Sequence, residues 1–374
     1  MTGTSTSRPD VPTGDENEPA GDEGESTGDG GRSTHPRGPQ QLPRTVSALV
    51  FLRDQGVFVI WGLLIVVFAF IGRPYFFTVT NAVLVANAAA ITAIFAAGVG
   101  IGVMTGSLDL SLPGTAAVAS CVCGRLLTHG SPTWLSLLAG LACGVVVGLL
   151  NGLIVLRGFN PVIVTIGAFS VLSGLAAVIA DGDNFPGLSQ LKFMGTHHYF
   201  ATGDFTGIPG PVFIVAAVYI VGYLFLTRTR GGLRVMAVGA NAEAVRRAGI
   251  NSGAYRVLGF VVSGTLAALG GLVSTATVTQ AGPSADPSII FSSLTAVSLT
   301  GIVLSGGRGS LPRILVGSLI LATISNGLII RGVQPYWSTV CTGALLIGSL
   351  FLERAVQNGV ASRLMDANLS AHQK

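Results

Sequence analysis

One carboxylate stands between two long apolar stretches of this chain, where an ionisable side chain could do chemistry. Asp109 lies in the segment TGSLDLSLPG at 105–114. Ionisable residues at membrane depth often mark solute pathways or gates, so a gating or substrate role is one interpretation. The other is local bracing, in which Asp109 or Ser111 caps a helix that Pro113 is suited to open. The residue types leave both interpretations open.

A second segment, GANAEAVRRAGI at 239–250, is short and polar. Asn241 can cap a helix, the residues after it are good helix formers, and Gly249 can end the helix. A helix of two turns is marginal in water by itself, so we expect it to dock on another surface. The alternative is a cationic loop whose arginines only orient the chain in a membrane.

Residue types for metal binding or catalysis are poorly placed. Cys121 and Cys123 are two apart on a predicted helix and point to nearly opposite sides, and His197 and His198 are adjacent, so neither pair suits one metal ion. Neither of the two lysines lies in a Gly-x-x-x-x-Gly-Lys-Ser/Thr phosphate loop. We therefore predict no catalytic residue, no metal and no cofactor. If ATP drives this protein, another subunit hydrolyses it.

The elements that position these residues follow from composition. Of 374 residues, 49% are hydrophobic and 10% are charged, whereas soluble domains carry about 25% charged residues. A membrane-spanning helix needs roughly 17 to 25 apolar residues. The fold class is therefore all-α, a polytopic membrane protein of about ten transmembrane helices. We expect spans at 57–72, 80–104, 109–127, 133–156, 159–180, 209–227, 255–278, 288–305, 311–330 and 335–352.

Charge fixes the expected orientation and the domain limits. With ten crossings, thirteen arginines fall on the side of the N-terminus and four basic residues on the other, which places both termini in the cytoplasm of a multi-pass cell-membrane protein. Residues 1–45 are acidic and polar without an apolar run, so we expect a disordered cytoplasmic tail. The membrane domain is predicted at 46–355 and a cytoplasmic C-terminal tail at 356–374.

A weak internal repeat accompanies the ten spans. The segment NGLIVLRGFNP at 151–161 is similar to NGLIIRGVQP at 326–335, with one residue deleted. These segments join the fourth to the fifth span and the ninth to the tenth. Five spans per half would make the two halves run in opposite directions, an inverted repeat. Chance similarity between Gly- and Leu-rich helices is the alternative.

Four ordered motifs resemble one protein family. They are TGSLDLSLPG at 105–114, GLLNGLIVLRGFNPVIVTIGA at 148–168, TRTRGGLRVMAVGANAEAVRRAGI at 227–250 and LSGGRGSLPRILVGSLILATISNGL at 304–328. Together they resemble the permease subunit of ribose/xylose/galactose-type (carbohydrate uptake) ABC importers, over about residues 57–352. The sequence departs from the family at 287–292, where PSIIFS replaces an acidic stretch.

The resemblance implies both partners and sites. Such permeases pair with a second permease copy or a paralogue, bind an ABC ATPase subunit with tandem nucleotide-binding domains, and receive sugar from an extracytoplasmic sugar-binding protein. They contact membrane lipid and no nucleic acid. The helix at 241–250 would couple to the ATPase through the following residues: Asn241, Glu243, Arg246, Arg247 and Gly249.

A path for a small sugar or polyol would need hydrogen-bonding side chains without fixed charge. Besides Asp109, the candidates for the translocation path or gating are Asn87, Asn151, Asn160, Gln280 and Asn326. Each of these amides could instead form a hydrogen bond between helices.

Two other classes remain as alternatives. A secondary transporter driven by an ion gradient usually needs titratable groups inside the membrane, and apart from Asp109 no Asp or Glu falls well inside a predicted span. A channel or membrane scaffold would carry no enzyme motif either, but the chain shows no charged ring or filter-like segment.

Overall fold

A computed structural model describes residues 44–195, 197–202, 207–302, 306–307 and 309–372, with side-chain environments between 55 and 355. Within these residues the chain is helical, as predicted, with one two-stranded pairing of β1 (His198–Tyr199) with β2 (Ile208–Pro209). Nearly all of the predicted N-terminal tail lies outside the described residues. So does Arg308 of the fourth motif.

Each of the ten expected spans overlaps a helix. These helices are α1 (Arg44–Ile71), α2 (Val79–Met104), α3 (Leu112–Thr128), α4 (Thr133–Leu156), α5 (Pro161–Ile179), α6 (Gly210–Arg228), α9 (Ser252–Val278), α10 (Ser288–Ser298), α11 (Leu311–Ile330) and α12 (Tyr336–His372). Between them lie η1 (Ser189–Met194), α7 (Arg230–Ala240) and α8 (Ala242–Arg247). By length and composition six helices can cross a membrane: α2, α4, α5, α6, α9 and α11. This confirms a helical, multi-pass membrane protein.

Four helix limits differ markedly from the expected spans. α1 begins at Arg44 rather than at residue 57. The third helix begins at Leu112 rather than at residue 109, because the residues before it form a side-chain-braced turn. The eighth expected span, 288–305, stops at Ser298, where Gly301 takes a φ of 69° and its N–H bonds back to Ser298. α12 continues to His372, so helix extends through the segment predicted as the C-terminal tail.

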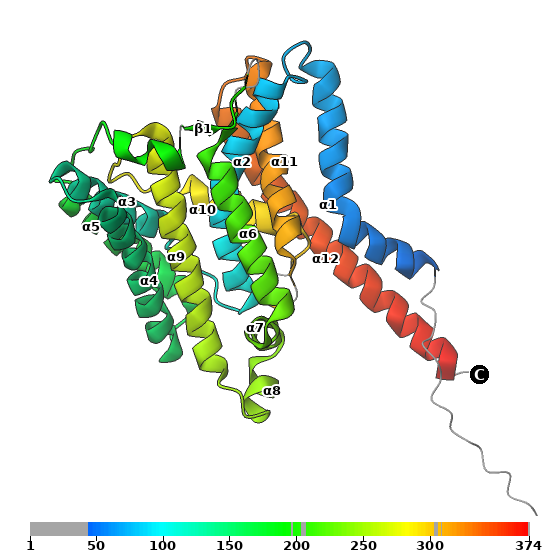
Figure 1. Ribbon diagram of the computed structural model, residues 1–374. Coiled ribbons are helices and arrows are strands. Elements are labelled where there is room, and N and C mark those ends of the chain that lie inside the picture. Colours follow the sequence, from blue (N-terminus) through cyan, green and yellow to red (C-terminus); the bar gives the residue numbers. More distant parts are fainter. Residues whose placement is uncertain (1–43, 196, 203–206, 303–305, 308, 373–374) are drawn as a thin grey trace, which may run out of the picture. The chain divides into compact units, whose positions relative to one another are not determined.

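The long helices run between two ends of the bundle (Figure 1). At one end lie η1 and β1, and we call it the β1 end; at the other lie α7 and α8, and we call it the α8 end. Arg331, just after α11, donates to the Ile71 carbonyl at the close of α1, with 3.3 Å between the two atoms. This contact joins the ends of both helices at the β1 end. Segment 326–335 of the weak repeat therefore lies at the β1 end, whereas segment 151–161 lies toward the α8 end, where Leu156 packs near Gly253.

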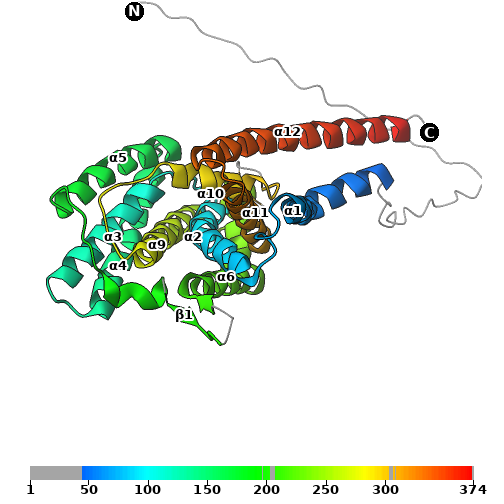
Figure 2. The ribbon, with the colours of Figure 1, turned by 90° about the horizontal axis from the view of Figure 1, so that it is seen from above.

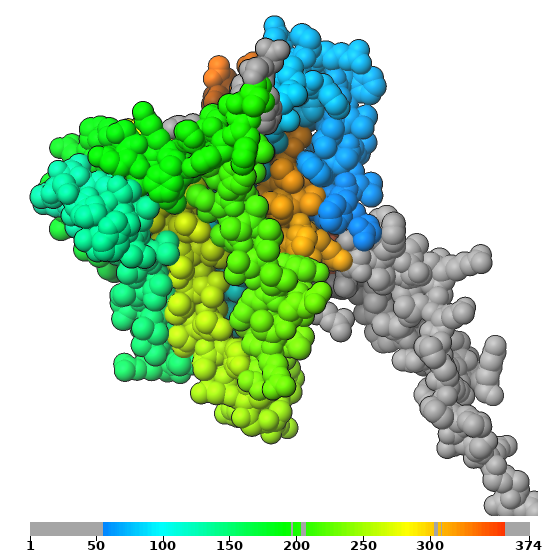
Figure 3. Space-filling model, viewed as in Figure 1, coloured from blue at the N-terminus to red at the C-terminus, as the bar shows by residue number. Residues whose placement is uncertain are grey.

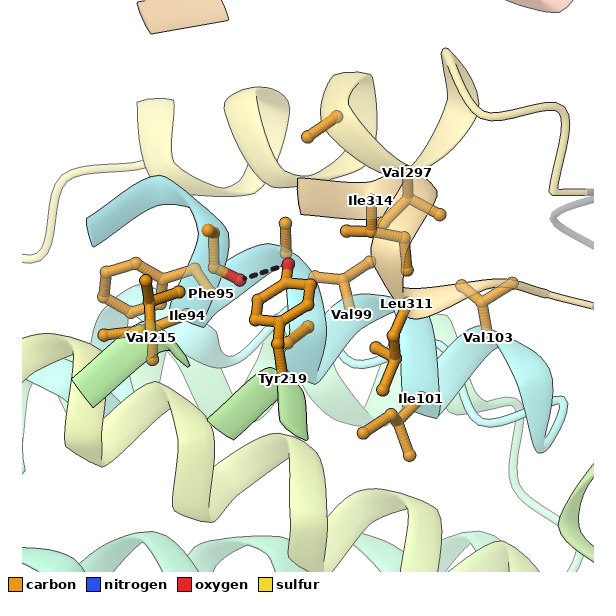
Figure 4. Close-up of a cluster of buried hydrophobic side chains, with 14 of the residues drawn as sticks. Ile94, Phe95, Val99, Ile101, Val103, Val215, Tyr219, Val297, Leu311 and Ile314 are labelled. Atoms are coloured by element: carbon orange, nitrogen blue, oxygen red, sulfur yellow. Dashed lines mark hydrogen bonds between the residues drawn. The ribbon is translucent and has the colours of Figure 1, made fainter. Parts of the chain in front are cut away.

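The core forms around α2 because small residues let its neighbours approach. Residues 93–105 of α2 and its C-cap are all buried, and α2 contacts α6, α9, α10 and α11. Figure 2 shows α2 with these four helices around it. In the hydrophobic cluster of Figure 4, the Tyr219 hydroxyl donates to the Ala93 carbonyl of α2 at 3.0 Å. The hydrogen bond satisfies a buried phenol whose ring packs in an apolar core.

Glycines set the contact between α4 and α9, the most extensive between any two described helices. A side chain at Gly144 would strike the Gly264 carbonyl, and one at Gly148 would lie 2.7 Å from Cα of Val261. Lipid supplies no hydrophobic force between helices, so close backbone approach through small residues provides the packing. The two helices are thereby held almost backbone to backbone.

Candidate functional site

The short helix α8 is built as the sequence predicts. The Asn241 side chain accepts a hydrogen bond from the Ala244 N–H at 2.9 Å, and Gly249 has a φ of 78° just after the helix. The Ile250 N–H then bonds the Val245 carbonyl at 3.2 Å, a closing pattern that uses the left-handed glycine. Val245 is the buried residue of α8. The helix is thus capped at both ends and attached through one apolar side chain.

The charged residues of α8 pair with one another on an exposed surface. Glu243 forms ion pairs with Arg246 at 2.7 Å and with Arg247 at 3.2 Å, and all three side chains are at least half exposed. Hydrogen bonds from Arg246 first, then from Arg247, lower the pKa of the Glu243 carboxyl. Exposed pairs of this kind contribute little to stability. They can therefore be exchanged for a partner's charges at small cost. In Figure 3 this segment forms the lower end of the bundle.

α7, which precedes α8, packs against the bundle through direct backbone contact at Gly239. A side chain at Gly239 of α7 would collide with the Met104 carbonyl at the end of α2 and would lie 2.7 Å from the Gly307 amide nitrogen. Two further α7 residues, Val235 and Val238, are buried. Displacement of α7 therefore acts directly on the backbone of α2 and on the connection that precedes α11.

Asp109 lies in a buried polar cluster just before α3. Its Oδ1 accepts hydrogen bonds from the Ser111 N–H at 2.9 Å and from the Ser111 hydroxyl at 2.6 Å. The Asn151 amide of α4 donates to the same hydroxyl oxygen at 3.0 Å. All three residues are at most 3% exposed. Oδ1 of Asp109 thus braces the turn before α3, whereas the N-cap residue Ser111 makes no side-chain capping hydrogen bond.

The second carboxylate oxygen has no such role. Oδ2 of Asp109 is buried and makes no hydrogen bond of good geometry among the described residues; the Ser263 hydroxyl of α9 lies close to this carboxylate and makes none either. Buried polar atoms without partners are rare in folded proteins and invite a functional explanation. This oxygen is therefore an acceptor without a geometric hydrogen bond inside a buried polar cluster.

A cavity of about 310 Å³ lies between α2, α3, α9, α10 and the connection 279–287. Polar groups line it together with apolar and small residues. The polar lining residues are Ser120, Asn184, Ser274, Thr275, Gln280, Ser284 and Asp286, and the others are Phe95, Pro113, Ala116, Ala117, Gly271, Val278, Gly282 and Ile289. Of the candidate path residues, the structure places Gln280 in this lining. None of the described lining residues is Lys or Arg.

Backbone pairing fixes the rim of the cavity, which we define as Asn184, Gln280, Ser284 and Asp286. All four are exposed. Phe185 and Ala281 form an isolated antiparallel bridge with N···O distances of 2.8 and 3.1 Å. The bridge brings the long connection after α5 against the end of α9, so that Asn184 lies against Gly282.

The remaining candidate amides lie elsewhere. The Asn326 amide of α11 donates to the Asn81 side chain of α2 at 2.8 Å, a hydrogen bond between two helices. Asn160 is exposed and caps α5 by accepting from the Val162 N–H at 2.9 Å. Oδ1 of Asn87 is buried and has no partner among the described residues. The six path candidates are therefore not gathered at one place.

Two turns with the same chemistry precede α3 and α10. In the first, Asp109 accepts from the Ser111 N–H and hydroxyl; in the second, Asp286 accepts from the Ser288 N–H at 2.9 Å and from its hydroxyl at 2.6 Å. Sequence reasoning missed Asp286, although Asp-x-Ser before an apolar run is visible at both places. Among the described residues no three His, Cys, Asp or Glu side chains come together as metal ligands.

Comparisons with known proteins cover nearly all of the helical bundle. A family model described as branched-chain amino acid transport system / permease component matches residues 81–350. The ribose import permease protein of Bacillus subtilis is 31% identical over 295 residues, 78% of this chain and 90% of its own length. The D-allose transport system permease protein of Escherichia coli is 29% identical over 303 residues, 80% and 91% of the two chains. The L-arabinose transport system permease protein of Escherichia coli is 28% identical over 305 residues, 81% and 90%. No solved structure matches.

Proposed function

This chain belongs to the family of transport-system permease components, and we propose that it is the membrane-spanning permease subunit of an ATP-driven ABC importer that moves a small sugar or sugar-like polyol into the cell. The observation that carries the proposal is similarity along almost the whole length of permeases for ribose, allose and arabinose. The chain is a transport subunit and not an enzyme.

The family description mentions branched-chain amino acids, and the chemistry of the cavity bears on that choice. An amino acid carries a carboxylate, which needs a cation or several N–H donors when it leaves water. The described lining residues of the cavity include no Lys or Arg and one carboxylate, Asp286. Uncharged hydroxyl groups suit these side chains better. The lining therefore supports a sugar or polyol as the solute.

ATP hydrolysis is assigned to a partner, an ABC ATPase subunit with tandem nucleotide-binding domains that binds α8. Three features support this: α8 is exposed, it is capped at both ends, and it is preceded by α7, in which Gly239 packs against the Met104 carbonyl of α2. A movement of α8 by the ATPase would reach α2 through that contact. Asn241, Glu243, Arg246, Arg247 and Gly249 are the proposed coupling residues.

The proposed topology has ten spans, five in each half, with both termini in the cytoplasm. The α8 end is then cytoplasmic, which agrees with the arginines concentrated in α7 and α8. The β1 end receives an extracytoplasmic sugar-binding protein. A second permease copy or a paralogue completes the membrane unit, and the tails at 1–45 and 356–374 lie in the cytoplasm.

Reconstitution tests this function directly. The permease is co-expressed with the ATPase and binding-protein genes that accompany it, purified as a complex and placed in liposomes. Uptake of radiolabelled D-ribose, D-allose, D-fructose, L-arabinose, D-xylose and D-galactose is then measured with ATP, without ATP, and with proton or sodium gradients. ATP-dependent uptake of at least one sugar is expected. Uptake by the permease alone on an ion gradient would identify a secondary transporter and overturn the proposal.

A further inference from the structure

We propose that the cavity between α2, α3, α9 and α10 is a binding site for one uncharged monosaccharide within each permease subunit. The inference rests on the proposed function and adds to it a location, a size limit and a charge preference. It follows from how two short helices begin, from the groups that face the cavity, and from its volume.

Two of the shorter apolar helices begin at this cavity. α3 has 17 residues, the lower limit for a span, and α10 has 11, so the connection before α10 must cover part of the membrane depth. Pro113 in the first turn of α3 and Ile289 in the first turn of α10 both line the cavity. Helix starts and irregular backbone within a membrane are tolerated where they line a polar cavity, and in transporters such broken helices form the solute site.

The two starts meet at the same cavity and correspond to one another in the proposed ten-span topology. There each is the third helix of its half, and each follows an Asp-x-Ser turn with nearly the same distances. The Asp286 turn lies at the rim, and the Asp109 turn lies beyond Pro113 toward the α8 end. The cavity thus lies between corresponding parts of two oppositely directed halves. Solute sites of repeat-built transporters lie at that interface.

The lining offers both donors and acceptors for hydroxyl groups. The amides of Asn184 and Gln280 donate and accept, and so do the hydroxyls of Ser120 and Ser274. Both oxygens of Asp286 already accept from Ser288, and an ionised carboxylate has about four acceptor positions, so it can take two sugar hydroxyls as well. The same carboxylate repels a phosphorylated sugar.

Volume and shape restrict the solute to one ring. Ligand pockets range over roughly 300–1,000 Å³, and this cavity of about 310 Å³ is at the lower limit. Phe95 lines the cavity at its apolar side but is only 2% exposed, and its ring packs on α9, where a side chain at Gly270 would lie 2.7 Å from the ring. A disaccharide would not fit.

Protection of an introduced thiol tests the site in the assembled importer. The native cysteines Cys121, Cys123, Cys143 and Cys341 are replaced by alanine, and Ser274→Cys is introduced. The rate of labelling by a charged methanethiosulfonate reagent from the outer side is measured with and without the sugar that the complex takes up. We expect labelling to slow about tenfold when the sugar is at roughly ten times its Kd. Gln280→Cys, at the rim, is a second reporter in case Ser274→Cys does not assemble.

The controls separate this inference from the proposed function. Ser189→Cys in η1 is exposed away from the cavity and should be labelled at a rate that sugar does not change. Sucrose and ribose 5-phosphate should not protect Ser274→Cys or Gln280→Cys. Unprotected reporters in a complex that takes up the sugar would overturn the site and leave the importer function intact, and so would equal protection by sucrose or the phosphate. A complex that takes up no sugar would refute the function itself.

Discussion

Replacing Gly148 with alanine tests whether the α4–α9 contact holds the bundle together. A Cβ there would lie 2.7 Å from Cα of Val261 and 2.8 Å from the carbonyl carbon of Phe260, whereas ordinary contacts begin near 3.4 Å. Both obstacles are backbone atoms, so no side chain can rotate away and the helices must separate. Overpacking typically costs about 1–3 kcal/mol, and the better helix propensity of alanine offsets about 1 kcal/mol. We expect a net loss of about 0–2 kcal/mol, up to a factor of roughly 30 in the folding equilibrium.

The assay is unfolding in mild detergent by increasing mole fractions of sodium dodecyl sulfate, followed by far-ultraviolet circular dichroism. Gly167→Ala on α5 is the matched control, since nothing lies within 4 Å of a Cβ at Gly167. That variant should be neutral or gain up to about 1 kcal/mol from helix propensity alone. If Gly148→Ala unfolds at the same detergent fraction as Gly167→Ala, the reasoning about backbone contact is wrong.

Three further outcomes follow from the sites at the α8 end and in the core. Arg246→Glu with Arg247→Glu should abolish co-purification with the ATPase and stop uptake while the detergent stability of the permease changes little; an intact, active complex would reject the docking role. Asn151→Leu removes the donor to the buried Ser111 hydroxyl at a cost of about 1–3 kcal/mol, so uptake should fall while the ATPase still co-purifies. The Glu243 carboxyl should titrate below its usual value of 4.5 in a carbon-13 NMR experiment, and Arg246→Ala should raise the midpoint. Because this pKa is lowered in the folded chain, any stability from the ion pairs is present above pH 4.5 and is lost as the pH falls through the lowered pKa; a midpoint at or above 4.5 would contradict the pairing.

Much of the helical arrangement follows from local signals. The predicted spans 133–156 and 311–330 coincide with α4 and α11 residue for residue, because Pro132 and Pro312 mark the starts and apolar composition does the rest. The limits of α8 were also predictable, since Asn241 and Gly249 act within a few residues of their own positions. Helix caps and the length of an apolar segment can both be read from a short stretch of sequence.

The cavity was not predictable in the same way. Its rim depends on the bridge between Phe185 and Ala281, which are far apart in the sequence and paired through backbone atoms that any residue type offers. From the sequence alone Asp286 is a turn residue. Only the structure shows that its hydrogen bonds to Ser288 match those of Asp109 to Ser111. Gln280 was singled out for its amide, but no sequence rule distinguishes it from Asn160, which caps a helix at the other end.

The Phe185–Ala281 bridge couples the entrance of the cavity to the long connection after α5. The bridge joins the backbone of the long connection after α5 to the backbone just after α9. A displacement of that connection would therefore move the rim residues together. A sugar-binding protein that docks on that connection would contact the segment that carries the bridge. Release of the sugar by the binding protein and opening of the cavity entrance would then occur in one conformational change.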